Sequence, residues 1–298
     1  MSTAMNQHRS GFVTIIGKPN VGKSTLMNRI LGEDLSVVTP KAQTTRHRIK
    51  GILNAPDYQI VFSDTPGIMK PAYKLHERML GAVDAAFQDA DAVMLVVEVG
   101  ERALSPEVEE RLKRNLAPLI LIINKIDLSD QAQLEERVDM WRNLLKPEVI
   151  IPVSAQENFN VQSIVDALVK IMPVHEPYFD KDDLSDRNVR FFVQEIVREK
   201  ILLQFQKELP YSCEVVVKEY REQPETDVIR CDIFVDRESQ KAILLGHKGA
   251  AIKSLGIASR TAIEKFTGKK IHLELTVKVK GDWRNDESQL DRFGYKDF

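Results

Sequence analysis

The sequence predicts an α/β domain with a mostly parallel sheet, followed by a smaller α+β domain. Between residues 11 and 172, short apolar runs alternate with helical patterns, which is the rhythm of a doubly wound sheet. A glycine-rich loop of the kind that cradles phosphates directly follows the first apolar run. After residue 185 the order changes to one helix, two alternating strands, two helices and a last strand.

The elements of the first domain follow from these periodicities. Expected strands are 12–16, 58–63, 92–97, 119–123 and 149–153, with 48–53 as an antiparallel edge strand. Expected helices are 24–31, 73–88, 106–115, 131–144 and 161–171. Sheets of this kind bind ligands beyond the carboxyl ends of their strands, so polar residues at those ends are the candidates for function.

The loop after the first strand fits the phosphate-binding pattern G-x-x-x-x-G-K-[ST]. Its backbone N–H groups and the helix that follows converge where a polyphosphate would lie. Lys23 is placed to reach the β- and γ-phosphates, and the Ser24 hydroxyl to bind a Mg²⁺ ion that bridges them. The nucleotide-contacting residues expected here are Gly17, Lys18, Pro19, Asn20, Val21, Gly22, Lys23, Ser24 and Thr25.

Composition limits the class of protein. The 298 residues carry 42 Lys and Arg against 44 Asp and Glu, a net charge of −2, so contact with nucleic acid must come from local patches. The polar stretch 1–9 excludes a secretory signal and no apolar run is long enough to span a membrane, which predicts a cytosolic protein. Cys213 and Cys231 both lie in strand-like runs and are expected to be buried free thiols.

A second candidate segment follows the strand at 58–63. There Asp64 is placed to hold Mg²⁺ through water, and the small backbone of Gly67 to donate its N–H to a γ-phosphate. Taken alone, Asp-Thr-Pro-Gly is also an ordinary turn. The residues expected to contact the nucleotide here are Asp64, Thr65, Pro66, Gly67 and Ile68.

Base selectivity is expected after the strand at 119–123. A carboxylate at Asp127 can accept two hydrogen bonds from guanine N1–H and its exocyclic amine, which adenine cannot supply. Such a site rejects the wrong base by roughly 10⁴-fold or more. Backbone N–H groups after the strand at 149–153 can meet the guanine carbonyl oxygen. The base-contacting residues expected are Asn124, Lys125, Ile126, Asp127, Ser154 and Ala155.

With these segments in order, the first domain resembles a translational-type P-loop GTPase domain. The resemblance implies a further mobile loop whose Thr closes on Mg²⁺ and γ-phosphate. The stretch 41–48 lies in the right place, which makes Thr45 the expected ligand and Thr44 the second choice. A Thr pair beside an edge strand is also ordinary strand-forming sequence. The expected metal ligands are Ser24, Thr45 and Asp64, and the expected catalytic residues are Lys23, Thr45, Gly67 and Asn20.

One departure bears on hydrolysis. Ras-like GTPases place a Gln after D-x-x-G to orient the attacking water, whereas this chain has Ile68, which cannot hydrogen-bond to water. With Asn20 in the phosphate loop, this resembles the GTPases of tRNA modification and ribosome assembly, several of which use K⁺. The resemblance suggests K⁺ held by Asn20 as a further cofactor beside GTP, GDP and Mg²⁺, although Asn20 could instead only shape the loop.

The second domain is similar to a prokaryotic, type II KH domain. Its Gly246, His247, Lys248 and Gly249 form a GxxG loop between two helices, which in KH domains clamps about four nucleotides of single-stranded nucleic acid. From 241 to 280 the chain has nine Lys or Arg against two Glu, the charge expected for a phosphate-binding surface. The expected RNA contacts are these four loop residues and Lys253; a solvated Lys-rich face is the alternative.

The combination of domains resembles the Era family, a TrmE-Era-EngA-like GTPase domain followed by a type II KH domain. The expected division is 1–172 for the GTPase domain, 173–185 for a Pro-rich acidic linker, 186–282 for the KH domain and 283–298 for a tail. In the tail, Trp283 is expected to pack on the sheet instead of stacking on bases.

The resemblance implies a GTPase that converts GTP to GDP and phosphate, binds 16S rRNA and acts in assembly of the small (30S) ribosomal subunit. It also implies a monomer that is cytoplasmic and peripherally attached to the inner membrane. Two other classes remain open at this point: a constitutive single-stranded RNA-binding protein with a scaffold GTPase domain, and an ATP-dependent kinase or ATPase. Asn124 and Asp127 argue against the last.

Overall fold

The structure, a computed structural model, describes residues 7–41 and 43–296. Residues 1–6, Ala42 and 297–298 lie outside it, and so do the parts of the expected first domain, mobile loop and tail that fall on them. The described residues form two compact units, one of 7–41, 43–71 and Met79–Asp186 and the other of Ala72–Arg78 and 187–296. Each unit has a sheet of its own.

The first unit is built on a six-stranded sheet in the order β2-β3-β1-β4-β5-β6. Only β2 runs antiparallel, paired with β3, so the expected antiparallel edge strand is confirmed. The chain winds outward from β1 in both directions, which puts the topological switch point, where such sheets bind ligands, beside β1. The strands are β1 (Arg9–Ile16), β2 (Ile49–Asn54), β3 (Tyr58–Asp64), β4 (Ala92–Glu98), β5 (Leu119–Asn124) and β6 (Val149–Pro152).

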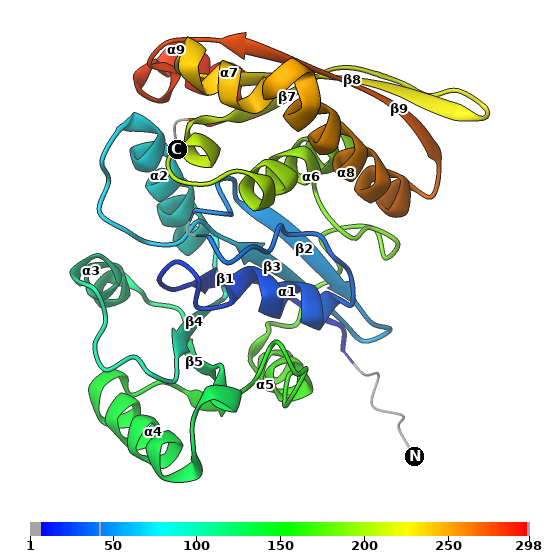
Figure 1. The fold of residues 1–298 in the computed structure, drawn as a ribbon. Helices are drawn as coiled ribbons and strands as arrows, with labels where there is room; N and C mark the ends of the chain where they lie inside the picture. Colours follow the sequence, from blue (N-terminus) through cyan, green and yellow to red (C-terminus); the bar gives the residue numbers. More distant parts are fainter. Residues whose placement is uncertain (1–6, 42, 297–298) are drawn as a thin grey trace. The chain divides into compact units, whose positions relative to one another are not determined.

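Helices cover this sheet on both faces (Figure 1). Every residue from 92 to 97 in β4 is buried, as a central strand of a doubly covered parallel sheet requires. One face packs in a cluster that includes Val83, Val108 and Trp141 from three different helices. The helices are α1 (Lys23–Leu31), α2 (Lys74–Gln88), α3 (Pro106–Arg114), α4 (Gln131–Leu145) and α5 (Gln162–Ile171).

The stretch 173–185, expected to be a linker, lies along the first unit. Ser185 forms an isolated β-bridge with Gly51 of β2. The buried amide of Gln59 accepts hydrogen bonds from the backbone N–H groups of Tyr178 and Phe179, at 2.7 and 3.0 Å. The stretch 173–185 shows no helical or strand periodicity, because it is held by side chains and strand edges that are distant in the sequence.

The second unit has a three-stranded sheet in the order β7-β8-β9, with β7 antiparallel and β9 parallel to β8. Two helices, α6 and α8, pack against it and against each other (Figure 1). The elements are α6 (Val189–Gln204), β7 (Glu214–Arg221), β8 (Thr226–Val235), α7 (Glu238–Leu245), α8 (Ala250–Thr267), β9 (Lys270–Val279) and α9 (Glu287–Arg292). The α/β first unit and this helix-strand-strand-helix-helix-strand order confirm the predicted fold class.

In the core of the second unit, every second residue along the central part of β8 is buried. Ile229, Cys231 and Ile233 of β8 are buried beneath Val197 of α6 and Leu255 of α8. Burial raises the pKa of the Cys231 thiol to about 12, so this cysteine is an inert core residue. Both cysteines are buried and free, as expected.

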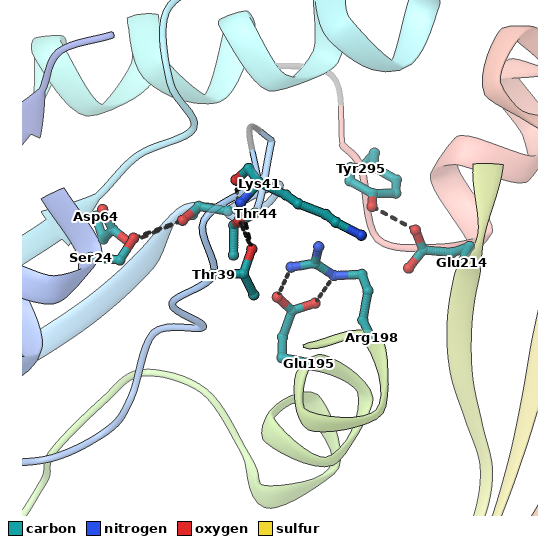
Figure 2. Close-up of polar contacts among 10 residues, drawn as sticks. Ser24, Thr39, Lys41, Thr44, Asp64, Glu195, Arg198, Glu214 and Tyr295 are labelled. Atoms are coloured by element: carbon teal, nitrogen blue, oxygen red, sulfur yellow. Dashed lines mark hydrogen bonds and ion pairs between the residues drawn. The ribbon is translucent and has the colours of Figure 1, made fainter. Parts of the chain in front are cut away.

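Figure 2 shows two polar side-chain contacts of this unit. Arg198 pairs with Glu195 one turn earlier on α6, where both side chains are buried. Tyr295 donates its hydroxyl to Glu214 of β7 at 2.7 Å. Trp283 is fully buried and its indole N–H donates to the Ser212 carbonyl at 3.0 Å, which confirms that it packs in the protein.

Candidate functional site

The phosphate loop lies between β1 and α1, at the carboxyl end of a central strand. Gly22 has φ of 99°, in the left-handed region, and a Cβ there would lie 2.2 Å from Asn124 Nδ2. Only glycine fits both the backbone conformation and the space. Helix α1 begins at the next residue, Lys23, so the loop leads directly into a helix N-terminus.

Lys23 is the buried cation of this loop. Its ammonium donates to the Gly17 carbonyl at 3.1 Å and the Lys18 carbonyl at 2.9 Å. Burial lowers its pKa to about 8, a shift that the charges of Asp64 and Glu101 partly oppose. Near neutral pH the group still carries its proton and can neutralise phosphate oxygens.

Two hydroxyls and one carboxylate meet at the start of α1, and Figure 2 labels two of them, Ser24 and Asp64. Ser24 Oγ donates to Asp64 Oδ2 at 2.7 Å and lies 2.9 Å from Thr45 Oγ1, which is itself 3.3 Å from Asp64 Oδ2. The structure thus brings together all three residues expected as metal ligands, from α1, from the loop between α1 and β2, and from the end of β3.

This group of oxygens fits a hard divalent cation. Asp64 is fully buried, and its Oδ1 has no hydrogen-bond partner among the described residues. Burial raises the pKa of this carboxyl, while the Ser24 hydrogen bond and the charge of Lys23 oppose the shift. A buried carboxylate oxygen without a partner beside two hydroxyls is the donor set that Mg²⁺ prefers.

The two neighbouring threonines of the mobile loop point to different partners. Thr45 reaches Ser24 and Asp64, whereas Thr44 Oγ1 lies 2.7 Å from Thr39 Oγ1 and donates to the Lys41 carbonyl at 2.7 Å (Figure 2). This geometry favours Thr45 over Thr44 as the metal-site residue.

The Asp-Thr-Pro-Gly segment lies against the phosphate loop. Thr65 donates its hydroxyl to the Ile15 carbonyl at 2.6 Å, which fixes the segment to β1. A Cβ at Gly67 would lie 2.8 Å from Pro19 atoms, so the two loops are in close contact. Ile68 is only 1% exposed and packs in the core cluster, and its N–H donates to the Gly17 carbonyl at 3.2 Å.

Asn124 joins the phosphate loop to the last candidate segment. Its Nδ2 donates to the Val21 carbonyl at 2.8 Å, and its Oδ1 accepts from the Ala155 N–H at 3.0 Å. Asp127 follows in a 3-10 turn, Ile126–Leu128, where its carboxylate is exposed and available to a base. Ser154 and Ala155 are buried beside it at the end of β6.

Two residues with structural roles at this site belong to no sequence motif, so their roles could not be predicted from the sequence. Asn28 of α1 makes a double hydrogen bond with the Ser36 backbone, at 2.8 and 2.9 Å, and so anchors the start of the mobile loop. Arg29 donates to the Ala155 carbonyl at 3.2 Å. Neither lies in a recognisable pattern, because each acts on a backbone distant in sequence.

In the second unit, the GxxG loop separates α7 from α8 as expected. Gly246 has φ of 71°, and a Cβ there would lie 2.6 Å from the Ala251 Cβ, so the turn requires glycine. His247 and Lys248 are exposed at the tip, and Lys253 is exposed on α8. The loop therefore presents backbone and cationic groups to solvent, as phosphate binding requires.

No group of three or more His, Cys, Asp or Glu residues that could hold a metal ion occurs within 7–41 and 43–296. Over the same ranges, no helix is both long and apolar enough to cross a membrane.

Comparison with protein families assigns both units. Residues 12–125 match the family described as a 50S ribosome-binding GTPase, and residues 208–284 match the KH domain. The segment 124–127, expected to select guanine, is called the guanine-selective segment below. Together with the phosphate loop and this segment, these matches define the class: a P-loop GTPase with a C-terminal KH domain.

The chain belongs to the Era family of GTPases. It is 44% identical over 294 residues to GTPase Era of Syntrophus aciditrophicus (strain SB), covering 97% of this chain and 96% of that protein. It is also 43% identical over 296 residues to a chloroplastic ERA-like GTPase of Oryza sativa subsp. japonica, covering 97% of this chain and 70% of the relative. Membership makes this chain a GTPase, as predicted.

Two solved structures of Era are similar over almost the whole chain. One is Era with MgGDPNP and nucleotides 1506–1542 of 16S ribosomal RNA (TM-score 0.92, 36% identity, 97% of this chain and 99% of that one). The other is a tyrosine-to-alanine variant of Aquifex aeolicus Era bound to GDP·AlF4⁻ (TM-score 0.92, 35% identity, 96% of this chain and 99% of that one).

Proposed function

We propose that this chain is a GTP-hydrolysing switch that binds 16S rRNA and acts in assembly of the small ribosomal subunit. The observation that carries the proposal is the convergence of Lys23, Ser24, Thr45, Asp64 and Asn124 at one edge of the first sheet. The exposed GxxG loop of the second unit supplies the RNA-binding half.

Nucleotide binding follows from the groups at that edge. The Lys23 ammonium neutralises the β- and γ-phosphates, the phosphate-loop N–H groups hold them, and Asp127 accepts the guanine N–H groups. Ser24, Thr45 and Asp64 would hold Mg²⁺, which supplies positive charge to the phosphate oxygens. Because Gly67 has no side chain, a γ-phosphate can approach its backbone N–H.

Hydrolysis cannot use the side chain after D-x-x-G to orient water, because Ile68 is apolar and buried. We propose that Asn20 instead helps to hold K⁺ near the phosphates. Asn20 has φ of 64° and its Nδ2 donates to the Pro40 carbonyl at 3.2 Å, so it lies where the phosphate loop meets the mobile loop. Steady-state GTP hydrolysis should be faster in K⁺ than in Na⁺ buffer, and Asn20→Ala should remove the difference; equal wild-type rates would refute the role.

RNA recognition is assigned to the second unit. The related Era structure with nucleotides 1506–1542 of 16S ribosomal RNA supports the choice of RNA. Gly246 and Gly249 let phosphates approach the backbone, and Lys248 and Lys253 add positive charge.

The test is to crosslink the purified protein to total RNA in the presence of GDPNP and to map the reads. We expect reads concentrated near the 3′ end of 16S rRNA, and loss of that peak with Lys248→Glu. Arg114→Gln, an exposed change on α3 of the first unit, is the matched control and should leave the peak intact. Reads spread evenly over RNA species would refute the proposed partner.

We further propose that the protein is a cytoplasmic monomer that attaches peripherally to the inner membrane. Family resemblance supports this, together with the basic stretch 241–280 of the second unit. Co-flotation with vesicles that contain anionic lipid tests the attachment, and a sedimentation mass of 33.9 kDa is expected for the monomer.

A further inference from the structure

The segment 98–105, which is the last residue of β4 and the loop that leads to α3, belongs to none of the nucleotide-binding motifs, yet it touches two of them. Glu101 Oε1 lies 2.5 Å from the ammonium of Lys18 in the phosphate loop. Lys18 also donates to the Ala103 carbonyl at 3.1 Å. At the other end of the loop, Glu98 Oε2 lies 3.1 Å from the ammonium of Lys125, in the guanine-selective segment.

The loop is held in this shape by its own contacts. Glu101 Oε2 accepts the Glu98 N–H at 3.2 Å, and the Glu101 N–H donates to the Glu98 carbonyl at 2.8 Å. Val99 is buried in the core cluster, and its N–H donates to the Asn124 carbonyl at 3.0 Å. The Glu101 side chain is only 14% exposed, so its pair with Lys18 is partly shielded from solvent.

We propose that this loop is a positioning element for the nucleotide site, in which Glu101 fixes the phosphate loop through Lys18 and Glu98 fixes the guanine-selective segment through Lys125. The proposal rests on the GTP-binding function described above. Glu98 and Glu101 are positioning residues, because each acts through a lysine of a motif.

If Glu98 and Glu101 acted on nucleotide affinity through their charge alone, their effect would be the opposite of a positioning effect. A negative group beside a polyphosphate site repels the nucleotide, so its removal would strengthen binding. Positioning predicts weaker binding when the carboxylate is removed, because Lys18 and the loop backbone lose their fixed geometry. Glu101 also raises the pKa of Lys23, which helps to keep that ammonium protonated.

The test compares Glu101→Gln and Glu98→Gln in the full chain, with GDP and GMP as competitors of a fluorescent GDP analogue. We expect Glu101→Gln to weaken GDP binding three- to tenfold with little effect on GMP, since only the phosphate contacts are disturbed. Glu98→Gln should weaken GDP and GMP equally, since it disturbs the base segment. Glu110→Gln breaks an exposed ion pair on α3 and is the control, which should change neither the GDP affinity nor the GMP affinity.

A double-mutant cycle separates positioning from a general loss of structure. The effects of Lys18→Gln and Glu101→Gln should be strongly non-additive, and the exchanged pair Lys18→Glu with Glu101→Lys should recover part of the GDP affinity. Additive effects, or tighter GDP binding by Glu101→Gln at low salt that disappears at high salt, would overturn the proposal. Failure of the wild-type protein to bind GDP would instead refute the GTP-binding function itself.

Discussion

At the scale of single residues, burial sets the chemistry of this site. Lys23 and Asp64 are buried next to each other, and each has its charged form disfavoured by desolvation and supported by the other. Two backbone carbonyls accept hydrogen bonds from the Lys23 ammonium, and the Ser24 hydroxyl donates to Asp64 Oδ2. This arrangement makes nucleotide binding sensitive to pH in a defined direction.

We predict that GDP affinity falls as pH rises above about 8. The pKa of Lys23 in the free protein is lowered to about 8, and phosphate binding requires the protonated amine. Below pH 7 the group is charged and the affinity is flat; above pH 8 one proton must be taken up on binding, which costs up to about tenfold per pH unit. Fluorescence titration with a GDP analogue between pH 6.5 and 9.5 measures the slope.

The control for this slope is Lys23→Arg. A guanidinium keeps its proton throughout the range, so its binding curve should be flat in pH even if the affinity itself is lower. A wild-type affinity that stays constant to pH 9.5 would contradict the assignment of Lys23 as the titrating phosphate ligand.

We predict that Asp127→Asn exchanges the base preference. The amide offers a donor where guanine also has a donor, so GDP affinity should fall by about 10²- to 10⁴-fold, while xanthosine diphosphate, with a carbonyl at that position, should bind more tightly than to the wild type. Competition binding with both nucleotides checks this. An unchanged preference for GDP would show that Asp127 does not contact the base.

At the scale of elements, strand ends and helix starts determine which groups meet. The strand positions along the chain, the antiparallel edge and the positions of the motifs after β1, β3, β5 and β6 could all be predicted, because apolar periodicity and motif spacing are local properties of the chain. The positions of Ser24 and Asp64 near each other followed from the rule for carboxyl ends of parallel strands, whereas Thr45 was expected from the family resemblance.

Other features could not be predicted because they depend on contacts between distant, unpatterned residues. The Pro and acidic residues of 173–185 predict a linker, yet the Gln59 side chain accepts hydrogen bonds from its backbone. Glu98 ends β4 and Glu101 lies in the loop that follows, and nothing in the sequence around them indicates that their partners are Lys125 and Lys18. Asn28 and Ser36 likewise meet only after the chain folds.

The GxxG element carries a prediction about salt. If Lys248 and Lys253 each contact a phosphate, replacing either by Gln should lower RNA affinity and reduce the slope of log K against log salt by about 0.7, the value for single strands. Binding of an RNA fragment measured between 50 and 300 mM KCl gives the slope. The same slope in wild type and variants would place the RNA elsewhere on the molecule.

At the scale of the whole molecule, the proposed switch combines a GTP-hydrolysing unit with an RNA-binding unit. In the proposed switch, the γ-phosphate would hold the Thr45 loop and the 64–68 segment together, and hydrolysis would release them. For this release to reach the second unit, the two nucleotide states must differ in their free energy of RNA binding. A constitutive RNA-binding protein with a scaffold GTPase unit would have no such difference.

The most direct test measures the affinity of one RNA fragment, with the sequence of the 3′ end of 16S rRNA, for the full chain saturated with GDPNP or with GDP. Coupling between sites is typically 5- to 150-fold, so we predict at least a fivefold difference that favours GDPNP. Lys23→Ala, which removes the phosphate-binding ammonium, should abolish the difference without abolishing RNA binding. Equal affinities of the wild-type protein in the two states would contradict the claim that GTP gates RNA binding.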